Sequence, residues 1–227
     1  MKQLVIVNAG LGDPSTTRQV AEQIADATVQ GVSAAGEGLG VDILDLRTLA
    51  VDLATYMTTF IPTDALQAAR RTVTGADALI VATPVFQGSY SGLFKMFFDT
   101  LEMKALDGMP VTMVATAGTP RHSMVLDYAV RPLLSFLHAV VLPTGVFAAT
   151  AEFGADSGLD NRVARAAREL TAQLTAVRGV AGFTAPDMPD AGPAAADPDA
   201  DPDPATDPDF RLPAGGFAAL LSGHTGR

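Results

Sequence analysis

Leu4-Val5-Ile6-Val7-Asn8-Ala9-Gly10-Leu11-Gly12-Asp13-Pro14-Ser15-Thr16-Thr17-Arg18 is the stretch of sequence that decides the fold. Its branched aliphatic start, residues 4–7, is typical of a strand buried on both faces of a parallel sheet. A Gly-rich loop follows. Asp13 and Pro14 are then placed as the N-cap and first position of a helix, whose apolar residues recur at helical spacing to about Val29. A buried strand therefore leads into a helix through a short loop.

The same alternation continues along the chain. It predicts further strands at 41–44, 78–83, 111–116 and 140–147, and further helices at 63–74, 91–102, 124–139 and 161–177. Five strand–helix units predict an α/β fold with a doubly wound parallel sheet. Five strands suit the flavodoxin-like order 2-1-3-4-5, in which a ligand binds beyond the carboxyl ends of the strands, where the strand order reverses.

The composition changes at Gly179, so we expect a single flavodoxin-like domain over residues 1–179. Residues 180–227 are rich in Asp, Pro, Ala and Gly, and eight aspartates but no basic residue lie between 186 and 209. Such a segment cannot bury enough apolar surface to offset the entropy of ordering it, so we expect a disordered acidic C-terminal tail that ends in a short apolar patch, Phe210 to Leu221. The formal net charge of −10 lies mostly in this tail and argues against nucleic acid as a partner.

The chain contains no cysteine. This excludes disulfides, thiolate metal sites, iron–sulfur clusters and cysteine nucleophiles, so any redox chemistry must come from a bound cofactor. The histidines lack companions at metal-ligand spacing, and we expect no metal site. No apolar run of about 18 residues and no signal-peptide pattern occurs, so we expect a cytoplasmic protein without a membrane partner.

The first of three loops expected at the carboxyl edge of the sheet covers residues 10–18. Backbone N–H groups at a helix start, together with the hydroxyls of Ser15, Thr16 and Thr17, form a cradle suited to a phosphate. The loop is neither a P-loop nor the dinucleotide-binding fingerprint. By pattern alone, an ordinary capped helix explains it equally well.

The other two loops offer groups that suit a flat, polar-edged ring. The second loop, 83–92, combines the fixed backbone of Pro84, the apolar face of Phe86 and the amide of Gln87. The third loop, 116–122, contains Gly118, which lets the backbone approach such a ring closely. A phosphate end and a ring end together indicate a mononucleotide site.

The second loop carries a long and specific resemblance. The run Ala82-Thr83-Pro84-Val85-Phe86-Gln87-Gly88-Ser89-Tyr90-Ser91-Gly92-Leu93-Phe94-Lys95 resembles the Thr-Pro-Val-Tyr-x-x-x-Tyr-Ser-Gly segment of the NADPH-dependent FMN reductases of two-component monooxygenase systems. The similarity continues through 116–122, 126–133 and 145–148. It is strongest to the branch associated with luciferase-like flavin monooxygenases, whose first loop also reads Pro-Ser-x-Thr-Arg.

The resemblance implies an NAD(P)H:FMN oxidoreductase that supplies reduced FMN to a partner flavin-dependent monooxygenase. It implies that the first loop holds the FMN phosphate and that the second and third loops frame the isoalloxazine. The implied residues are Gly10, Leu11, Ser15, Thr16, Thr17 and Arg18 in the first loop, Pro84, Val85, Phe86 and Gln87 in the second, and Gly118 and Thr119 in the third. Hydride passes between stacked cofactors, NADPH or NADH and FMN, so no catalytic side chain is expected. A homo-oligomer, a tetramer or dimer, is implied as well, with a π-bulge at Tyr128 in the interface helix.

Two departures from the family pattern suggest weak retention of FMN. Gly10-Leu11-Gly12 stands where relatives have Ser-Pro-Arg, and Phe86 replaces a tyrosine. Two alternatives stay open from the sequence. One is a quinone or azo-dye reductase that keeps FMN bound, and the other is a flavodoxin-like electron carrier without enzyme activity, although such carriers usually supply aromatic walls and this chain has no Trp and only three Tyr.

Overall fold

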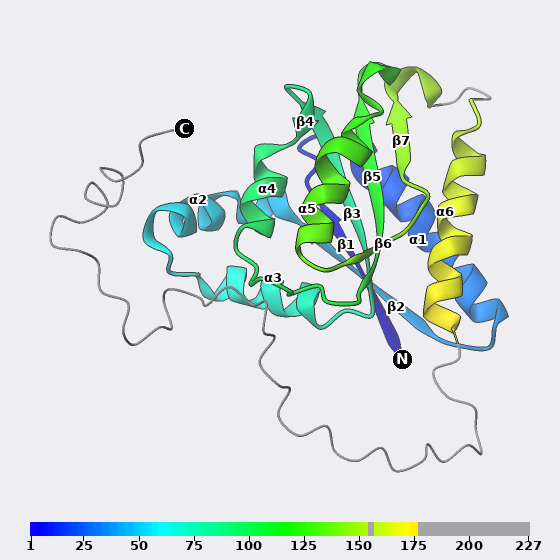
Figure 1. The fold of residues 1–227 in the computed structure, drawn as a ribbon, viewed down its shortest axis with the longest axis horizontal. Coiled ribbons are helices and arrows are strands. Elements are labelled where there is room, and N and C mark those ends of the chain that lie inside the picture. Colours follow the sequence, from blue (N-terminus) through cyan, green and yellow to red (C-terminus); the bar gives the residue numbers. More distant parts are fainter. Residues whose placement is uncertain (154–156, 177–227) are drawn as a thin grey trace, which may run out of the picture. The chain divides into compact units, whose positions relative to one another are not determined.

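The computed structural model describes residues 1–153 and 157–176, in which strands and helices alternate (Figure 1). The strands are β1 (Lys2–Asn8), β2 (Leu39–Asp45), β3 (Ala78–Phe86), β4 (Ser89–Tyr90), β5 (Pro110–Ala117), β6 (Val140–Val141) and β7 (Val146–Ala149). The α-helices are α1 (Thr16–Ala34), α2 (Ala50–Thr59), α3 (Asp64–Thr74), α4 (Gly92–Phe98), α5 (Arg131–Phe136) and α6 (Leu159–Thr175). Shorter helical turns are η1 (Leu46–Leu49), η2 (Pro120–His122), the π-helix η3 (Leu126–Val130) and η4 (Thr150–Glu152).

The sheet confirms the predicted fold class. Its order is β2-β1-β3-β5-β6, all parallel, with β7 also on β5, and β4 pairs antiparallel with β3. The predicted single strand 140–147 is wrong, because the structure divides it into β6 and β7. Pro143 lies between them, and a proline has no N–H to donate to the ladder. The flavodoxin-like order thus holds, with the last position filled by two short strands.

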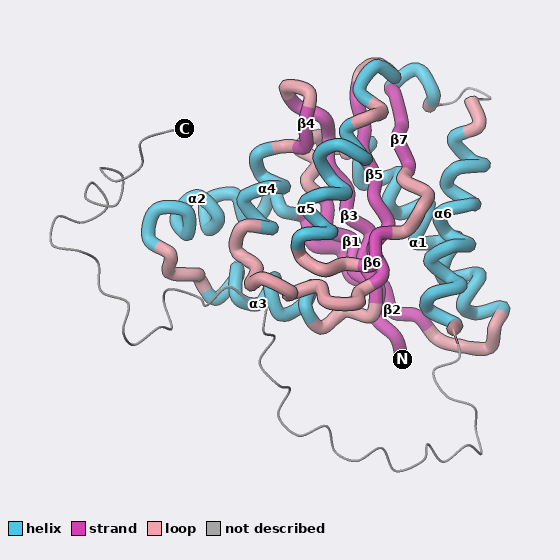
Figure 2. The backbone as a smooth tube through the Cα atoms, viewed as in Figure 1, coloured by secondary structure: helices cyan, strands magenta, loops and turns pink. Residues whose placement is uncertain are grey.

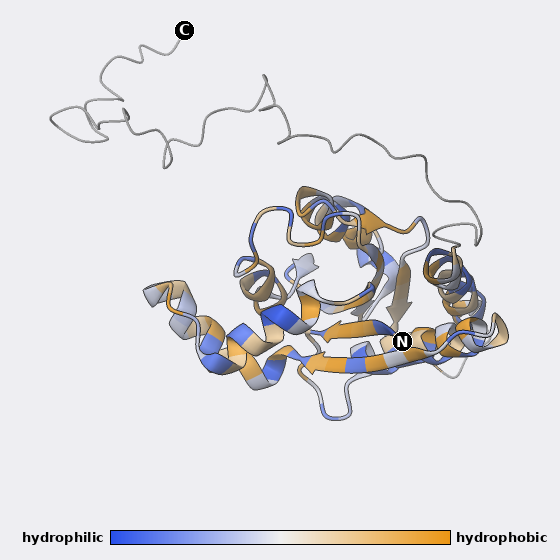
Figure 3. Ribbon diagram, turned by 90° about the horizontal axis from the view of Figure 1, so that it is seen from below, coloured by the Kyte–Doolittle hydropathy of each residue, from blue (hydrophilic) through white to orange (hydrophobic). Residues whose placement is uncertain are grey.

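Two apolar cores lie on opposite faces of the sheet, and Figure 2 shows the strands between two groups of helices. Val5 and Val7 of β1 face the core that includes α2 to α5, whereas Leu4 and Ile6 face the core that includes α1 and α6. All four side chains are at most 1% exposed. Figure 3 shows the strands as the most uniformly hydrophobic elements. Burial on both faces is therefore the reason that a continuous aliphatic run forms this strand.

The start of α1 differs from the prediction. Ser15, not Asp13, is the N-cap: its backbone is extended and its Oγ accepts a hydrogen bond from Arg18 N at 3.2 Å. The helix therefore begins at Thr16, two residues after Pro14. Asp and Ser are comparable N-caps, so the sequence alone does not distinguish between these neighbouring positions.

Other differences concern helices. The predicted helix 91–102 ends at Phe98, and the predicted helix 124–139 consists of η3 and α5. Helix α2 was not predicted, although Leu49, Leu53 and Tyr56 recur at helical spacing along it and contact one apolar core; within α2 itself only Leu53 is buried. Among the described helices, none is both long and apolar enough to cross a membrane. The tail and its apolar patch lie outside the described residues, so the domain boundary at 179 and the disorder beyond it stay predictions.

Candidate functional site

The three loops singled out from the sequence leave β1, β3 and β5 at one edge of the sheet. Asn8 is in register with Ala82, and Pro84 with Thr116, so the three strands end side by side. Ala9 N, the first residue after β1, donates to Ala82 O at 2.8 Å. Because β2 lies on one side of β1 and β3 on the other, this edge is the switch point at which open α/β sheets bind ligands.

The first loop makes a tight backbone cradle at Gly10. Its N–H donates to Asn8 Oδ1 at 3.0 Å, and a Cβ at position 10 would overlap Ser15 Oγ and lie 3.0 Å from Asn8 Oδ1. Asn8 is fully buried, and its Nδ2 is among the buried polar atoms of the described residues without a hydrogen-bond partner. A buried N–H donor left without an acceptor is costly. A tight loop with an unsatisfied buried donor fits an anionic group such as the FMN phosphate.

Ser15 and Thr16 present the N-terminus of α1 to this cradle. In any α-helix the first N–H groups have no acceptor within the helix. Ser15 Oγ satisfies that of Arg18, which leaves the N–H groups of Thr16 and Thr17 for an outside acceptor. The first turn of α1 contains no acidic residue, so its positive dipole end is not neutralised there.

Thr17 has a different position from the other two hydroxyl residues. Its side chain is buried, and its Oγ1 lies 2.7 Å from Thr116 Oγ1 at the end of β5. The Thr17 hydroxyl therefore connects the first loop to the carboxyl end of β5 and is not free. What Thr17 can offer a phosphate is its backbone N–H.

Two arginines flank the first loop. Arg18 Nε pairs with Glu22 Oε1 at 2.7 Å, and this hydrogen bond is the main reason that the pKa of Arg18 is raised above its ordinary value. Arg47 follows β2, and its Nη1 donates to Leu11 O at 3.4 Å. Both line a cavity of about 240 Å³ next to Ser15. Arg47 was missed from the sequence, since only the pairing of β1 with β2 brings it to this loop.

The second loop is a β-hairpin. Phe86 pairs with Ser89, and the two residues between them, Gln87 and Gly88, have φ values of 50° and 76°, as a type I′ turn requires. Thr83 Oγ1 accepts from Ser91 N at 3.0 Å and fixes the base of the hairpin. Phe86 is 46% exposed at its tip, while Pro84 and Val85 are half-buried. The hairpin therefore presents an aromatic face at the carboxyl edge.

The third loop is open. Gly118 and Thr119 are exposed, and a Cβ at Gly118 would meet no atom within 4 Å. Beyond them, Arg121 and His122 are also exposed. Arg121 and His122 line a cavity of about 370 Å³ between the hairpin and the π-helix, together with Gly88, Ser89, Met124, Val125, Tyr128 and Ala129.

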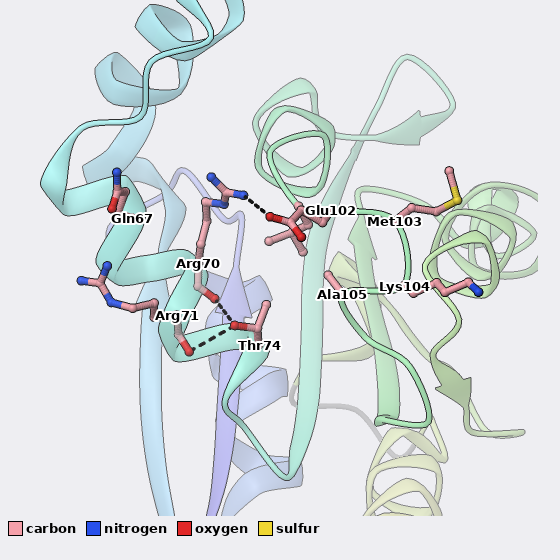
Figure 4. Close-up of a pocket in the computed structure, with 9 residues that line it drawn as sticks. Gln67, Arg70, Arg71, Thr74, Glu102, Met103, Lys104 and Ala105 are labelled. Carbon is pink, nitrogen blue, oxygen red and sulfur yellow. Dashed lines mark hydrogen bonds and ion pairs between the residues drawn. The ribbon is translucent and has the colours of Figure 1, made fainter. Parts of the chain in front are cut away.

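A larger cavity lies elsewhere. It has a volume of about 550 Å³ and is lined by α3 and by residues 101–105 after α4 (Figure 4). Both segments precede strands, so this cavity is at the amino ends of the strands, opposite the predicted site. Within it, Arg70 reaches Glu102 at 3.9 Å, while Lys95 pairs with Asp99 at 2.5 Å. Asp99 and Glu102 are thus partners in separate ion pairs and are both exposed.

A doubly wound parallel sheet with these three loops at its switch point defines a flavodoxin-like protein. Residues 1–154 match the family described as NADPH-dependent FMN reductase, and the chain belongs to this family. The resemblance of residues 82–95 to NADPH-dependent FMN reductases is thereby confirmed.

Individual relatives agree with this assignment. The chain is 38% identical over 154 residues to an FMN reductase (NADPH) of Pseudomonas aeruginosa, which covers 66% of this chain and 78% of the relative. It is 36% identical over 182 residues to the NADH-dependent FMN reductase SfnE of Pseudomonas putida, covering 80% and 92%. The solved structure of an oxidoreductase from Corynebacterium diphtheriae is similar with a TM-score of 0.74 and 52% identity, covering 76% of this chain and 96% of that one. The protein is therefore an oxidoreductase of the type that uses FMN with NAD(P)H.

Proposed function

We propose that this protein reduces FMN with NADPH or NADH and releases the product to a partner flavin-dependent monooxygenase. The observation that carries the proposal is the contrast at the carboxyl edge: a tight polar cradle in the first loop lies beside two open, exposed ring loops. The cradle is suited to a phosphate, and the exposed Phe86, Gly118 and Thr119 are suited to a ring that enters and leaves.

In this proposal the first loop anchors FMN through backbone N–H groups of Thr16 and Thr17, the hydroxyl of Ser15 and the amide of Asn8. When bound, FMN supplies the ring that accepts a hydride from the nicotinamide. The second and third loops position that ring, and their backbone N–H groups favour the negative charge that develops on it. No side chain has to transfer a proton in the hydride step, so no acid or base is assigned.

The nicotinamide nucleotide is assigned to the cavity between the hairpin and the π-helix. Its apolar lining, which includes Met124 and Val125, suits the nicotinamide ring, and Arg121 offers a cation to the nucleotide's phosphates. No ion pair holds Arg121 within the described residues. The cavity adjoins Gly88 and Ser89 of the hairpin, so a nucleotide there lies next to the proposed flavin ring.

A homotetramer is part of the same proposal. The predicted π-helical turn at Tyr128 is present as η3, and Tyr128 and Phe136 are 76% and 65% exposed. Large exposed apolar side chains on adjoining helices mark a surface suited to a second subunit. Light scattering at micromolar concentration should give an oligomer mass; a monomer would contradict this part of the proposal.

The function is tested with protein purified without added flavin. Colourless protein that oxidises NADPH or NADH only when FMN is added, with saturation, is the expected result. Stoichiometric flavin that survives dialysis would contradict release of FMN. In that case, activity with a quinone or azo dye as acceptor would indicate the bound-FMN reductase, and no activity with any acceptor would indicate an electron carrier.

A further inference from the structure

Arg47 reaches the first loop from the neighbouring strand β2. Asn8 and Asp45, the last residues of β1 and β2, are in register, and Asp45 Oδ1 caps η1 by accepting from Arg47 N at 3.1 Å. From this turn the guanidinium contacts Leu11 O and lies 3.8 Å from Asp13 Oδ2. Strand pairing and the cap thus fix the Arg47 backbone beside the proposed phosphate cradle.

Arg47 is held less firmly than Arg18. Arg18 is bound to Glu22 at 2.7 Å along the helix, whereas both contacts of Arg47 are at or beyond 3.4 Å. The Arg47 side chain is 43% exposed and its partner Asp13 is 85% exposed. An exposed ion pair at such a distance contributes little, so Arg47 can exchange Asp13 for a stronger partner at small cost.

The cavity beside the first loop holds more carboxylates than guanidiniums. Asp13, Glu22 and Asp45 line it together with Arg18 and Arg47. A phosphate monoester carries a charge of about −1.5 to −2 near neutral pH. A guanidinium that turns toward it would favour its binding in such surroundings, and Arg47 is the less firmly held of the two.

We propose that Arg47 recognises the terminal phosphate of FMN. Its guanidinium gives up the contact with Asp13 and forms a charge-assisted hydrogen bond with the phosphate. Arg47 is therefore the residue that makes the protein prefer FMN to riboflavin. This rests on the proposed function, in which FMN binds at the first loop. Asp13 then acts as a competitor that weakens FMN binding and favours its release.

The test compares FMN with riboflavin, which has the same ring and no phosphate. KM for each flavin is measured with the full-length protein at saturating NADPH and constant ionic strength. Arg47→Met should raise KM for FMN by about 10- to 100-fold, because one charge-assisted hydrogen bond to the phosphate is lost. It should leave KM for riboflavin unchanged. Arg47→Lys should give an intermediate KM for FMN. Asp13→Asn should lower KM for FMN alone. Arg71→Met, on an exposed arginine of α3, is the matched control and should change neither KM.

The outcomes separate this inference from the function on which it rests. Equal changes of KM for both flavins in Arg47→Met, or a selective loss of FMN in Arg18→Met instead, would overturn the role of Arg47 while leaving flavin reduction intact. If Arg47→Met does not fold in a thermal melt, Asp13→Asn decides, and an unchanged preference for FMN overturns the proposal. Wild-type protein that oxidises NADPH with neither flavin would refute the proposed function itself, and the role of Arg47 with it.

Discussion

The two ends of the proposed flavin site are built differently. At the phosphate end, Asn8, Ser15 and Thr17 each hydrogen-bond inside the protein before any ligand binds. At the ring end, Phe86, Gly118 and Arg121 are exposed. A preorganised end loses little freedom on binding, whereas an open end admits the flavin and the nicotinamide in turn. The comparison indicates that the phosphate end supplies affinity and the ring end supplies access.

The largest effect on the phosphate end is expected from a substitution that fills the space beside Gly10. Gly10→Ala places a Cβ against Ser15 Oγ and Asn8 Oδ1, so the loop must shift. Since overpacking of this kind typically costs about 1–3 kcal/mol, KM for FMN should rise by about 10- to 100-fold. Gly92→Ala is the matched control, because a Cβ there meets no atom within 4 Å, and it should leave KM unchanged. An unaltered KM in Gly10→Ala would contradict the cradle.

Variants at Ser15 and Thr17 distinguish the roles of these two hydroxyl groups at the phosphate end. Ser15→Ala removes both the N-cap and a phosphate donor, so KM for FMN should rise by about 10-fold. Thr17→Val leaves Thr116 Oγ1 buried without its partner, so the free energy of unfolding should fall by about 1–3 kcal/mol in thermal melts. The double variant Thr17→Val/Thr116→Val removes both partners and should recover most of that loss. A large change in KM without loss of stability in Thr17→Val would show that its hydroxyl binds FMN directly.

Substitutions at the ring end should change FMN binding and leave the stability of the fold unchanged. Phe86→Ala removes an apolar face that is already 46% exposed, so the melting temperature should hold while KM for FMN rises by about 5-fold. Phe86→Tyr keeps the ring and should change KM little. Loss of stability in Phe86→Ala with KM unaltered would mean that Phe86 serves the hairpin and not the flavin.

A smaller effect is expected at the nucleotide cavity. Arg121→Met should raise KM for NADPH by about 2- to 4-fold, as for one exposed charged contact, and leave KM for FMN unchanged. Arg71→Met again serves as control. If KM for FMN changed and that for NADPH did not, the assignment of this cavity to the nucleotide would be wrong.

The sequence predicted the strands better than the details of the site. Runs such as Leu4 to Val7 identify strands because both faces of the sheet are covered, so every residue in the run is apolar. The helix start at Ser15 was mistaken for Asp13, since adjacent residues with equal capping tendency compete and only three-dimensional geometry selects one.

The missed features depend on contacts between distant residues. The Thr17–Thr116 hydrogen bond joins residues 99 positions apart, and Arg47 meets Leu11 across two paired strands. No local pattern encodes either contact. Helix α2 is a different case: Leu49, Leu53 and Tyr56 give it a short periodic signal, but only Leu53 within the helix is buried and Val51 is 78% exposed, so the signal is weak.

The most direct test of the contrast between an anchoring end and an open end is NADPH oxidation as free FMN is varied over protein purified without flavin. An open ring end predicts protein that is colourless as purified and a rate that rises from zero to saturation with added FMN. A yellow protein with stoichiometric flavin, whose rate with an added electron acceptor is indifferent to free FMN, would contradict it.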